Sequence, residues 1–283
     1  MNIGFIGQGW IGKHYADDFE NRGYVTVRYS LEPEYRGNKD ALQECGIVFI
    51  AVPTPTTRSG FDDSYVRSAL EALHTGSIAV IKSTLLPGTT EKLQEVFPDL
   101  YILHSPEFLV EKTAAYDAAN PLRQIIGIPK ENAIYRTKAQ AVLEVLPKAP
   151  YEAIVSAREA ELIKYAGNCF LLTKVLFMNM LYDLAEVEGA DWGAIKEALI
   201  HDPRIGRSHM DPLHNGGRGA GGHCFIKDFE AFRRLYDNAV KDAYGSRILE
   251  AQAEKNIALL VGSGKDLDLL RSVYGEIHTT ASV

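Results

Sequence analysis

Cysteine is scarce in this chain of 283 residues. Only Cys45, Cys169 and Cys224 are present, and no two of them lie close together in the sequence. An odd number of separated cysteines argues against a disulfide framework and against a cysteine-rich zinc site. The sequence therefore predicts a reduced, cytoplasmic protein without a metal site.

Basic blocks and long apolar runs are missing as well. The chain has 30 Lys and Arg against 37 Asp and Glu, which gives a net charge of -7, so we expect no nucleic acid partner. The longest apolar stretch, residues 169–184, is interrupted by Lys174, Asn179 and Asp183, so we expect no membrane-spanning segment. The first residues read directly as a buried strand rather than as a signal peptide.

Short apolar runs rich in β-branched residues alternate with helical patterns through the first half of the chain. Continuous runs of this kind are typical of parallel strands that are buried on both faces. They predict an α/β fold with a doubly wound, Rossmann-like parallel sheet. The expected strands are Asn2–Ile6, Val25–Tyr29, Ile47–Val52, Ile78–Lys82, Tyr101–Leu103 and Gln124–Ile128.

The pattern becomes entirely helical after residue 155. Residues 156–188 contain no proline and one glycine, Gly167, and their apolar residues recur at helical spacing. We therefore predict a dinucleotide-binding domain at residues 1–155 and a helical domain at residues 156–283 around one long helix. Its apolar stripe predicts a homodimer. Further helices are expected at Trp192–Leu199, Asp228–Leu235, Lys241–Leu260 and Leu267–Val273.

A glycine motif follows the first expected strand and opens a helix: Gly7, Gly9 and Gly12, with Trp10 and Ile11 between the last two. In a βαβ unit this spacing is typical of a turn that holds the pyrophosphate of a dinucleotide. Ser30 stands where the second strand usually ends in an acidic residue that binds the ribose. Either Glu32 reaches the ribose, or Ser30 with Arg28 or Arg36 accommodates a 2′-phosphate, so the sequence predicts NAD and leaves NADP open.

A second glycine-rich segment leads to Cys224, at the start of an expected helix. A helix N-terminus favours the thiolate, and Asp228 lies one helical turn further on. Lys164 and Asn168 share a face of the long helix, where two donors could hold an oxyanion. Ser105 and Pro106 suggest a helix start that would put Glu107 and Glu111 on one helical face.

Taken together and in order, these segments resemble the UDP-glucose/GDP-mannose dehydrogenases over roughly residues 1–260. The resemblance implies a two-step, four-electron oxidation of a nucleotide-sugar primary alcohol to a carboxylate, of the UDP-glucose to UDP-glucuronate type. The matching segments are Gly7–Gly12, Val52–Pro55, Lys82–Thr84, Ser105–Leu109, Glu159–Tyr165 with Asn168, Arg204–Gly206 and Gly221–Asp228.

The resemblance also implies roles for single residues. Cys224 would capture the aldehyde as a thiohemiacetal, whose oxidation gives a thioester that water hydrolyses. Lys164 and Asn168 would stabilise the oxyanion, Asp228 and Thr84 would position a water or a proton, and Glu111 would assist hydrolysis. Arg204 would reach the sugar across a dimer contact. The remaining substrate contacts would come from Glu107, Phe108, Leu109, Gly221 and Lys227, and further cofactor contacts from Val52, Pro53 and Thr84.

Some features depart from the family pattern. His223 stands where a small polar residue is usual, Ile226 where proline is usual and Ala220 where an aromatic residue is usual, which bears on the shape of the sugar pocket. The residues after 262 are too few for the family's third, nucleotide-covering domain, so we expect that domain to be absent. A two-electron hydroxyacid-type dehydrogenase of the same architecture and a non-catalytic NAD-binding homologue are the alternatives.

Overall fold

The structure is a computed structural model that describes residues 2–276. Its contacts divide the chain into two compact units. The first contains Met1–Pro55 and Asp62–Lys164, and the second contains Thr56–Phe61 and Tyr165–Val283. The second unit thus takes six residues from within the first half of the sequence.

Seven strands form one sheet in the first unit, in the order β2-β1-β3-β6-β7-β8-β9. Every neighbouring pair is parallel except β7 with β8. The predicted Rossmann-like fold is confirmed, because the order reverses at β1 as it does in doubly wound sheets. The strands are β1 (Asn2–Ile6), β2 (Thr26–Tyr29), β3 (Cys45–Ile50), β6 (Ile78–Ile81), β7 (Tyr101–His104), β8 (Arg123–Ile128) and β9 (Tyr151–Ser156).

All six expected strands are present, with ends shifted by at most two residues, but β9 was not expected from the sequence. This strand lies at the edge of the sheet and pairs only with β8. Its first residues, Tyr151 and Glu152, are exposed, so it lacks the continuous apolar run that identified the other strands.

Helices connect most of the strands of the first unit. The side chain of Asn132 caps α5 by accepting a hydrogen bond from the backbone N–H of Tyr135 at 3.0 Å. The helices are α1 (Trp10–Asn21), α2 (Ser64–Leu70), α3 (Thr89–Val96), α4 (Ala114–Ala119) and α5 (Ala133–Val145), with 3-10 turns η1 (Arg36–Asn38), η2 (Asp40–Glu44) and η3 (Glu111–Thr113).

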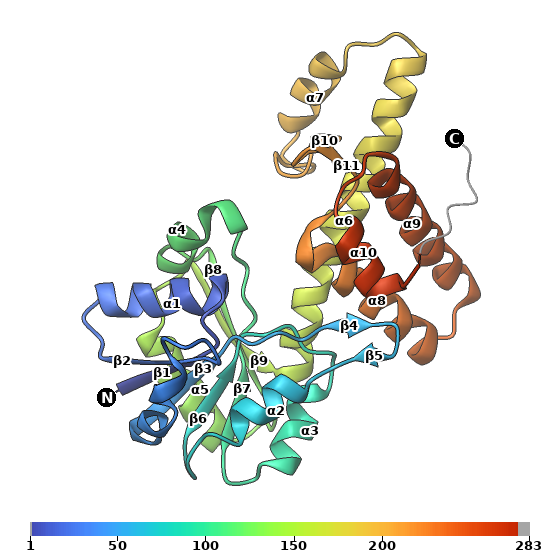
Figure 1. The fold of residues 1–283 in the computed structure, drawn as a ribbon. Coiled ribbons are helices and arrows are strands. Elements are labelled where there is room, and N and C mark those ends of the chain that lie inside the picture. Colours follow the sequence, from blue (N-terminus) through green and yellow to red (C-terminus); the bar gives the residue numbers. More distant parts are fainter. Residues whose placement is uncertain (1, 277–283) are drawn as a thin grey trace. The chain divides into compact units, whose positions relative to one another are not determined.

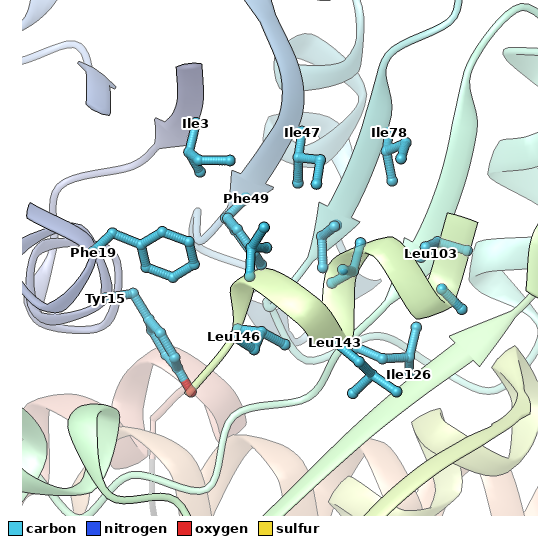
Figure 2. Packing of buried hydrophobic residues seen from close by; sticks show 14 of the residues in the cluster. Ile3, Tyr15, Phe19, Ile47, Phe49, Ile78, Leu103, Ile126, Leu143 and Leu146 are labelled. Atoms are coloured by element: carbon cyan, nitrogen blue, oxygen red, sulfur yellow. The ribbon is translucent and has the colours of Figure 1, made fainter. Parts of the chain in front are cut away.

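The main core of the first unit lies between the sheet and the helices α1 and α5. Figure 2 shows strand residues such as Ile47 and Ile78 on one side and Leu143 and Leu146 on the other. Three phenylalanines hold α1 against β1 and β3: Phe5 stacks on Phe49 at 5.3 Å between ring centroids and meets Phe19 edge-on at 5.2 Å. This packing holds the last turn of α1 against β1 and β3.

The second unit is built on α6 (Ala157–Val187), which matches the predicted long helix 156–188 (Figure 1). Its residues up to Lys164 belong to the first unit and those from Tyr165 to the second. Leu172 and Leu176 of α6 pack with Phe229 of α8 and Leu259 of α9. The other helices are α7 (Trp192–Ile200), α8 (Gly222–Ala239), α9 (Ala243–Gly262) and α10 (Leu267–Tyr274), with small hairpins β10–β11 (Leu213–His214, Gly217–Arg218) and β4–β5 (Thr56–Thr57, Gly60–Phe61).

The β4–β5 hairpin is part of the second unit because it packs on α8 and α10. The guanidinium of Arg234 donates to the carbonyl of Thr57 at 2.8 Å. Within residues 2–276, no helix is both long and apolar enough to cross a membrane.

A matched pair of leucines tests the core of the first unit. Leu103 in β7 is 0% exposed, whereas Leu122 just before β8 is 83% exposed. We expect Leu103→Ala to lower the free energy of unfolding by about 3–5 kcal/mol, because it leaves a cavity in a packed core. Leu122→Ala should change it by less than about 0.5 kcal/mol. Urea unfolding of both variants measures the difference, and equal effects would show that Leu103 is not a core residue.

Candidate functional site

The glycine turn after β1 is shaped for close approach of a ligand to the backbone. A side chain at Gly7 would lie 2.2 Å from the carbonyl oxygen of Ala51, and one at Gly12 would lie 1.9 Å from that of Gly7, so neither position tolerates a Cβ atom. The space in front of Gly9 is open to at least 4 Å. Gly9 also begins α1 without a side-chain cap, which leaves the first N–H groups of the helix available.

This turn lies where the strand order reverses between β1 and β3. In open parallel sheets, ligands bind at such a reversal, beyond the carboxyl ends of the strands. Trp10 and Ile11 form the first turn of α1 and are half-buried. The residues of this turn therefore fit the pyrophosphate of a dinucleotide.

The end of β2 holds the residues that would meet the adenosine ribose. The Ser30 hydroxyl accepts a hydrogen bond from the backbone N–H of Glu32 at 3.3 Å. Arg28 is committed elsewhere, since its guanidinium pairs with Asp17 and Glu20, both at 2.7 Å. Arg36 folds back on the carbonyl of Leu31 at 2.6 Å. Two arginines were considered for binding a 2′-phosphate. Arg28 is paired with carboxylates, whereas the contacts of Arg36 described here are with the carbonyl of Leu31, next to Ser30.

The loops after β3 and β6 are joined by one serine. Ser83 exchanges two hydrogen bonds with the backbone of Val52: its hydroxyl donates to the carbonyl at 2.7 Å and accepts from the N–H at 3.0 Å. Pro53 is exposed and Thr84 is 9% exposed. The Val52, Pro53 and Thr84 segments thus lie at the same edge of the sheet as the glycine turn, because parallel strands all end at one edge.

Glu107 and Lys164 form a buried ion pair in the first unit. The ammonium Nζ of Lys164 lies 2.6 Å from Oε1 of Glu107 and 2.8 Å from its backbone oxygen, and the two side chains are 6% and 3% exposed. The other carboxylate oxygen accepts from the N–H of Leu109 at 2.8 Å. Phe108 lies beneath the guanidinium of Arg123, 3.7 Å from its ring centroid. Since each charge is desolvated, removing either partner would leave the other uncompensated.

The helix expected to begin at Ser105 is not present. Residues 105–110 have no regular structure, and only the short turn η3 starts at Glu111. The prediction that Glu107 and Glu111 share a helical face is therefore wrong. Glu107 is buried and pairs with Lys164, while Glu111 is exposed.

A second buried carboxylate, Glu161, ties the loop after β6 to α6. It is 0% exposed and accepts from the N–H of Gly88 at 2.5 Å, from the N–H of Thr90 at 2.8 Å and from the Thr90 hydroxyl at 2.6 Å. Burial raises the pKa of this carboxyl, and the hydrogen bonds from Thr90 and Gly88 partly offset the rise. The loop that carries Thr84 is thereby fixed to the helix turn that carries Lys164.

Lys82 is a buried cation that the sequence analysis did not single out. It is 1% exposed, donates to the Ser105 hydroxyl at 3.0 Å and lies 4.4 Å from the ring centroid of Tyr15. Burial lowers the pKa of Lys82 to about 7; the charge of Lys164 lowers it further, and that of Glu107 opposes the change.

Cys224 is the third residue of α8 and is half-buried. Gly221 precedes the helix without a side-chain cap. The thiol therefore lies in the first turn, where the partial positive charge of the helix end acts on it. The helix begins at Gly222, which has a φ of 82°, so the helix start expected at Cys224 is present within two residues, and α8 also includes the helix expected from Asp228.

Asp228 is 1% exposed, and both of its oxygens are bonded. Oδ1 pairs with the ammonium of Lys227 at 2.6 Å, and Oδ2 accepts from the amide of Asn168 at 2.6 Å. Because α6 and α8 meet at this carboxylate, Asn168 is oriented by Asp228. His223 is exposed, whereas Ala220 and Ile226 are both 2% exposed. Two of the three departures from the family pattern therefore lie in packed positions.

The predicted catalytic and substrate residues fall into two groups. Thr84, Glu107, Phe108, Leu109, Glu111 and Lys164 belong to the first unit, whereas Asn168, Arg204, Gly221, Cys224, Lys227 and Asp228 belong to the second. Arg204 is 88% exposed and forks onto the carboxylate of Asp202 at 2.6 Å. Among residues 2–276, no group of three or more His, Cys, Asp or Glu side chains gathers as metal ligands would.

Asn256 was not expected from the sequence, and no role was expected for Lys82, Ser83 or Glu161, although these three lie in the segments that resemble the family. Asn256 of α9 is 4% exposed and holds the backbone of Ala220 from both sides, accepting at 2.8 Å and donating at 3.0 Å. A signal was available for it: Asn256 interrupts the apolar stripe of α9 that includes Ala253 and Leu260. A polar residue in a core-facing stripe needs a buried partner.

Comparison with known proteins gives matches over both units. Residues 28–145 match the NAD binding domain of the UDP-glucose/GDP-mannose dehydrogenase family, and residues 158–257 match its central domain. The UDP-glucose 6-dehydrogenase of Rickettsia typhi is 33% identical over 299 residues, which cover 90% of this chain and 67% of that protein. UDP-glucose 6-dehydrogenase TuaD of Bacillus subtilis is 33% identical over 76% of this chain and 47% of its own length.

Solved structures share the fold. A UDP-glucose dehydrogenase from Pyrobaculum islandicum superposes with a TM-score of 0.76 at 29% identity, over 89% of this chain and 68% of that one. A 3-hydroxyisobutyrate dehydrogenase from Mycobacterium tuberculosis gives a TM-score of 0.70 at 17% identity, over 95% and 96%, which shows a common fold alone. The chain spans about half the length of several curated relatives, such as TuaD.

The low pKa of Lys82 predicts a pH dependence of stability. Because the folded state releases its proton near pH 7 and the unfolded state near 10.5, the unfolded chain binds more protons between these values. The free energy of unfolding should therefore rise with pH in that window, and Lys82→Met should flatten the rise and stabilise the protein most below about pH 7. Urea unfolding at about pH 6.5 and about pH 9.5 measures the slope. Lys92→Met, which removes an exposed ammonium from α3, should leave the slope as it is. Equal slopes for the wild type and Lys82→Met would contradict the argument.

Proposed function

The chain belongs to the UDP-glucose/GDP-mannose dehydrogenase family, and we propose that it oxidises the primary alcohol of a nucleotide sugar to a carboxylate in two steps, with NAD as the cofactor. The observation that carries the proposal is the arrangement of residues around the thiol of Cys224. Cys224 lies in the first turn of α8, one helical turn from a buried Asp228 whose oxygens are held by Lys227 and Asn168. A two-electron dehydrogenase of the same architecture has no need of this thiol.

The glycine turn is the proposed cofactor site. When bound there, NAD would supply the hydride acceptor for both oxidations. Gly7, Gly9 and Gly12, with Trp10 and Ile11 in the first turn of α1, would hold its pyrophosphate, Ser30 would meet the ribose, and Val52, Pro53 and Thr84 would complete the site. Arg28 is neutralised by two carboxylates, so Arg36 is the arginine that remains beside Ser30 to meet a 2′-phosphate, and NAD is the proposed cofactor.

The proposed role of Cys224 is covalent capture. The first oxidation removes a hydride from the alcohol carbon and a proton from its hydroxyl group, which gives an aldehyde. The thiolate then forms a C–S bond with the aldehyde carbon, and the resulting thiohemiacetal loses two more electrons to become a thioester. Water breaks the C–S bond, which releases the carboxylate and returns the thiol. Capture keeps the aldehyde on the protein between the two oxidations.

The remaining site residues bind, orient or move protons. Lys164 and Asn168 would stabilise the oxyanion, Asp228 and Thr84 would position a water or a proton, and Glu111 would assist thioester hydrolysis. Support comes from the two buried carboxylates, because Glu107 orients the ammonium of Lys164 and Asp228 orients the amide of Asn168. Glu107, Phe108, Leu109, Arg204, Gly221 and Lys227 are the proposed substrate contacts.

The stoichiometry of cofactor reduction tests the reaction type. A four-electron oxidation reduces two NAD per sugar, whereas a hydroxyacid-type dehydrogenase reduces one. Complete conversion of a limiting amount of UDP-glucose or GDP-mannose, followed by absorbance of the reduced cofactor, separates the two. NAD binding without turnover on any sugar nucleotide would favour a non-catalytic homologue.

The second part of the proposal is a homodimer built on α6. Exposed apolar side chains recur along this helix at spacings of seven, three, four and three residues, which places them on one face. They are Phe170, Phe177, Met180, Leu184 and Val187, and each is at least 49% exposed. A stripe of this kind is most often covered by a second copy in an isologous contact.

We expect Cys224→Ser to abolish steady turnover, by about a thousandfold or more, because a hydroxyl is a far weaker nucleophile at neutral pH. Its affinity for NAD should stay nearly unchanged, because the thiol is not part of the glycine turn. Calorimetric titration with NAD and steady-state assays measure the two effects. Cys45→Ala, at a buried position in β3, should keep its activity. Substantial acid formation by Cys224→Ser would remove the thiol from the mechanism.

For the dimer, sedimentation velocity at micromolar concentration should give the mass of two chains. Phe177→Glu places a charge in the apolar face of α6 and should yield monomers. Ile248→Glu places the same charge on the exposed side of α9, where Ile248 is 61% exposed, and should leave the dimer intact. A wild-type chain that sediments only as a monomer would contradict the proposal, including the role of Arg204 across the contact.

A further inference from the structure

The glycine-rich loop before α8 is held by side chains from the end of α9 and the link to α10. Asn256 bonds both backbone groups of Ala220. The Ser263 hydroxyl accepts from the N–H of Arg218 at 3.0 Å, and the ammonium of Lys265 donates to the carbonyl of Gly219 at 3.0 Å. All of these contacts lie within the second unit, so the loop that leads to Cys224 has a fixed backing.

Two glycines of this loop are required because the side chains behind the loop leave no room for a Cβ atom. A Cβ atom at Gly217 would lie 2.7 Å from Oγ of Ser263, and one at Gly221 would lie 1.9 Å from Oδ2 of Asp266. The loop backbone therefore packs directly on these side chains, and the glycine content reflects close contact as well as flexibility.

Asp266 makes the contact nearest to the helix start. Its Oδ2 accepts from the N–H of Gly222, the first residue of α8, at 2.7 Å. A carboxylate thus caps α8 from a distant segment, in place of the missing cap at Gly221. Asp266 itself adopts a φ of 53°, in the left-handed region that only a few residues besides glycine tolerate. This strained backbone conformation places the carboxylate of Asp266 against the start of α8.

The carboxylate of Asp266 and the thiol of Cys224 therefore lie at the same helix end. The partial positive charge of a helix N-terminus stabilises an anion. When a carboxylate already lies there, its negative charge reduces the stabilisation that a thiolate at the same helix end would receive. We propose that Asp266 is a positioning residue for Cys224: its hydrogen bond fixes the first turn of α8, and its charge moderates the stabilisation of the thiolate by the helix. This proposal rests on the role of Cys224 given above.

Other charged groups near this turn are accounted for by their contacts. Within α8, Lys227 and Asp228 pair with each other. From the link to α10, Lys265 donates to the carbonyl of Gly219; burial lowers the pKa of this ammonium, and the neighbouring charge of Asp266 opposes the change. From the segment before β10, His209 packs its ring 5.7 Å from that of Phe225, and burial lowers the pKa of this histidine. Among these charged groups, Asp266 is the one that accepts a hydrogen bond from the backbone of α8.

Alkylation of Cys224 by iodoacetamide in the absence of substrate and cofactor tests the charge. Asp266→Asn keeps a hydrogen-bond acceptor and tolerates the left-handed backbone, so it removes the charge alone. We expect its alkylation rate near neutral pH to rise about two- to fivefold, with the pH profile displaced to lower pH. Asp268→Asn, at a 97% exposed position two residues further on, makes the same change in net charge and should leave the profile in place.

The other two thiols do not confuse this measurement. Burial raises the pKa of Cys45 to about 11, and burial together with the charge of Asp228 raises the pKa of Cys169. Mass spectrometry of the alkylated protein, with Cys224→Ser as the blank, assigns the reaction. Asp266→Ser serves as a second neutral variant if Asp266→Asn does not fold.

The positioning part is tested by amide hydrogen exchange. Asp266→Ala removes the acceptor, so exchange in residues 216–226 should accelerate, whereas Asp266→Asn should keep it slow. An unchanged alkylation profile in Asp266→Asn, or equal exchange in Asp266→Ala and the wild type, overturns the proposal. Failure of the proposed function is a separate outcome, since it would appear as absent turnover and would leave both measurements interpretable.

Discussion

Parallel strands end at one edge of their sheet, and the first unit depends on this constraint. Gly7 follows β1, Val52 follows β3, Ser83 and Thr84 follow β6, and Glu107 lies three residues beyond β7. These segments are far apart in the sequence, yet the parallel register between β1, β3, β6 and β7 brings them to the same edge. The reversal of strand order at β1 then opens the place where a ligand can approach the backbone. Side chains at this edge need only short loops to meet, which is why Ser83 can bond Val52 directly.

Buried carboxylates hold the other site residues in place. Glu107, Glu161 and Asp228 are each at most 3% exposed, and each is satisfied by groups from another segment of the same unit. A desolvated carboxylate without partners would be strongly destabilising, so the native partners are specified closely. Glu161 does this without any cation, through backbone N–H groups and a hydroxyl. The residues expected to act on a substrate, Lys164 and Asn168, are therefore held by acids that need not take part in the chemistry.

The sequence predicted the sheet, the long helix and the family, because continuous apolar runs, helical spacing and glycine turns are local patterns. Prediction from the sequence failed where the local structure depends on a residue that is distant in the chain. The segment after Ser105 carries a good helix-start pattern, but residues 105–110 form no helix, and Glu107 pairs instead with Lys164, 57 residues away. The edge strand β9 has one neighbour and an exposed end, so its composition carries little signal. Asp266 is an ordinary polar residue in the sequence, and its contact with Gly222, 44 residues earlier, is visible only in the fold.

The β4–β5 hairpin makes the second unit discontinuous, with a consequence for how the chain acquires its structure. The bond between Arg234 and the carbonyl of Thr57 joins residues 177 positions apart. During synthesis from the N-terminus, residues 56–61 emerge long before α8 and α10, so the hairpin must wait for its packing surface. Contacts of such high sequence separation slow folding, because the intervening chain must be ordered before they form. A fragment that begins at residue 165 would lack the hairpin altogether and would expose the side of α8 and α10 that it covers.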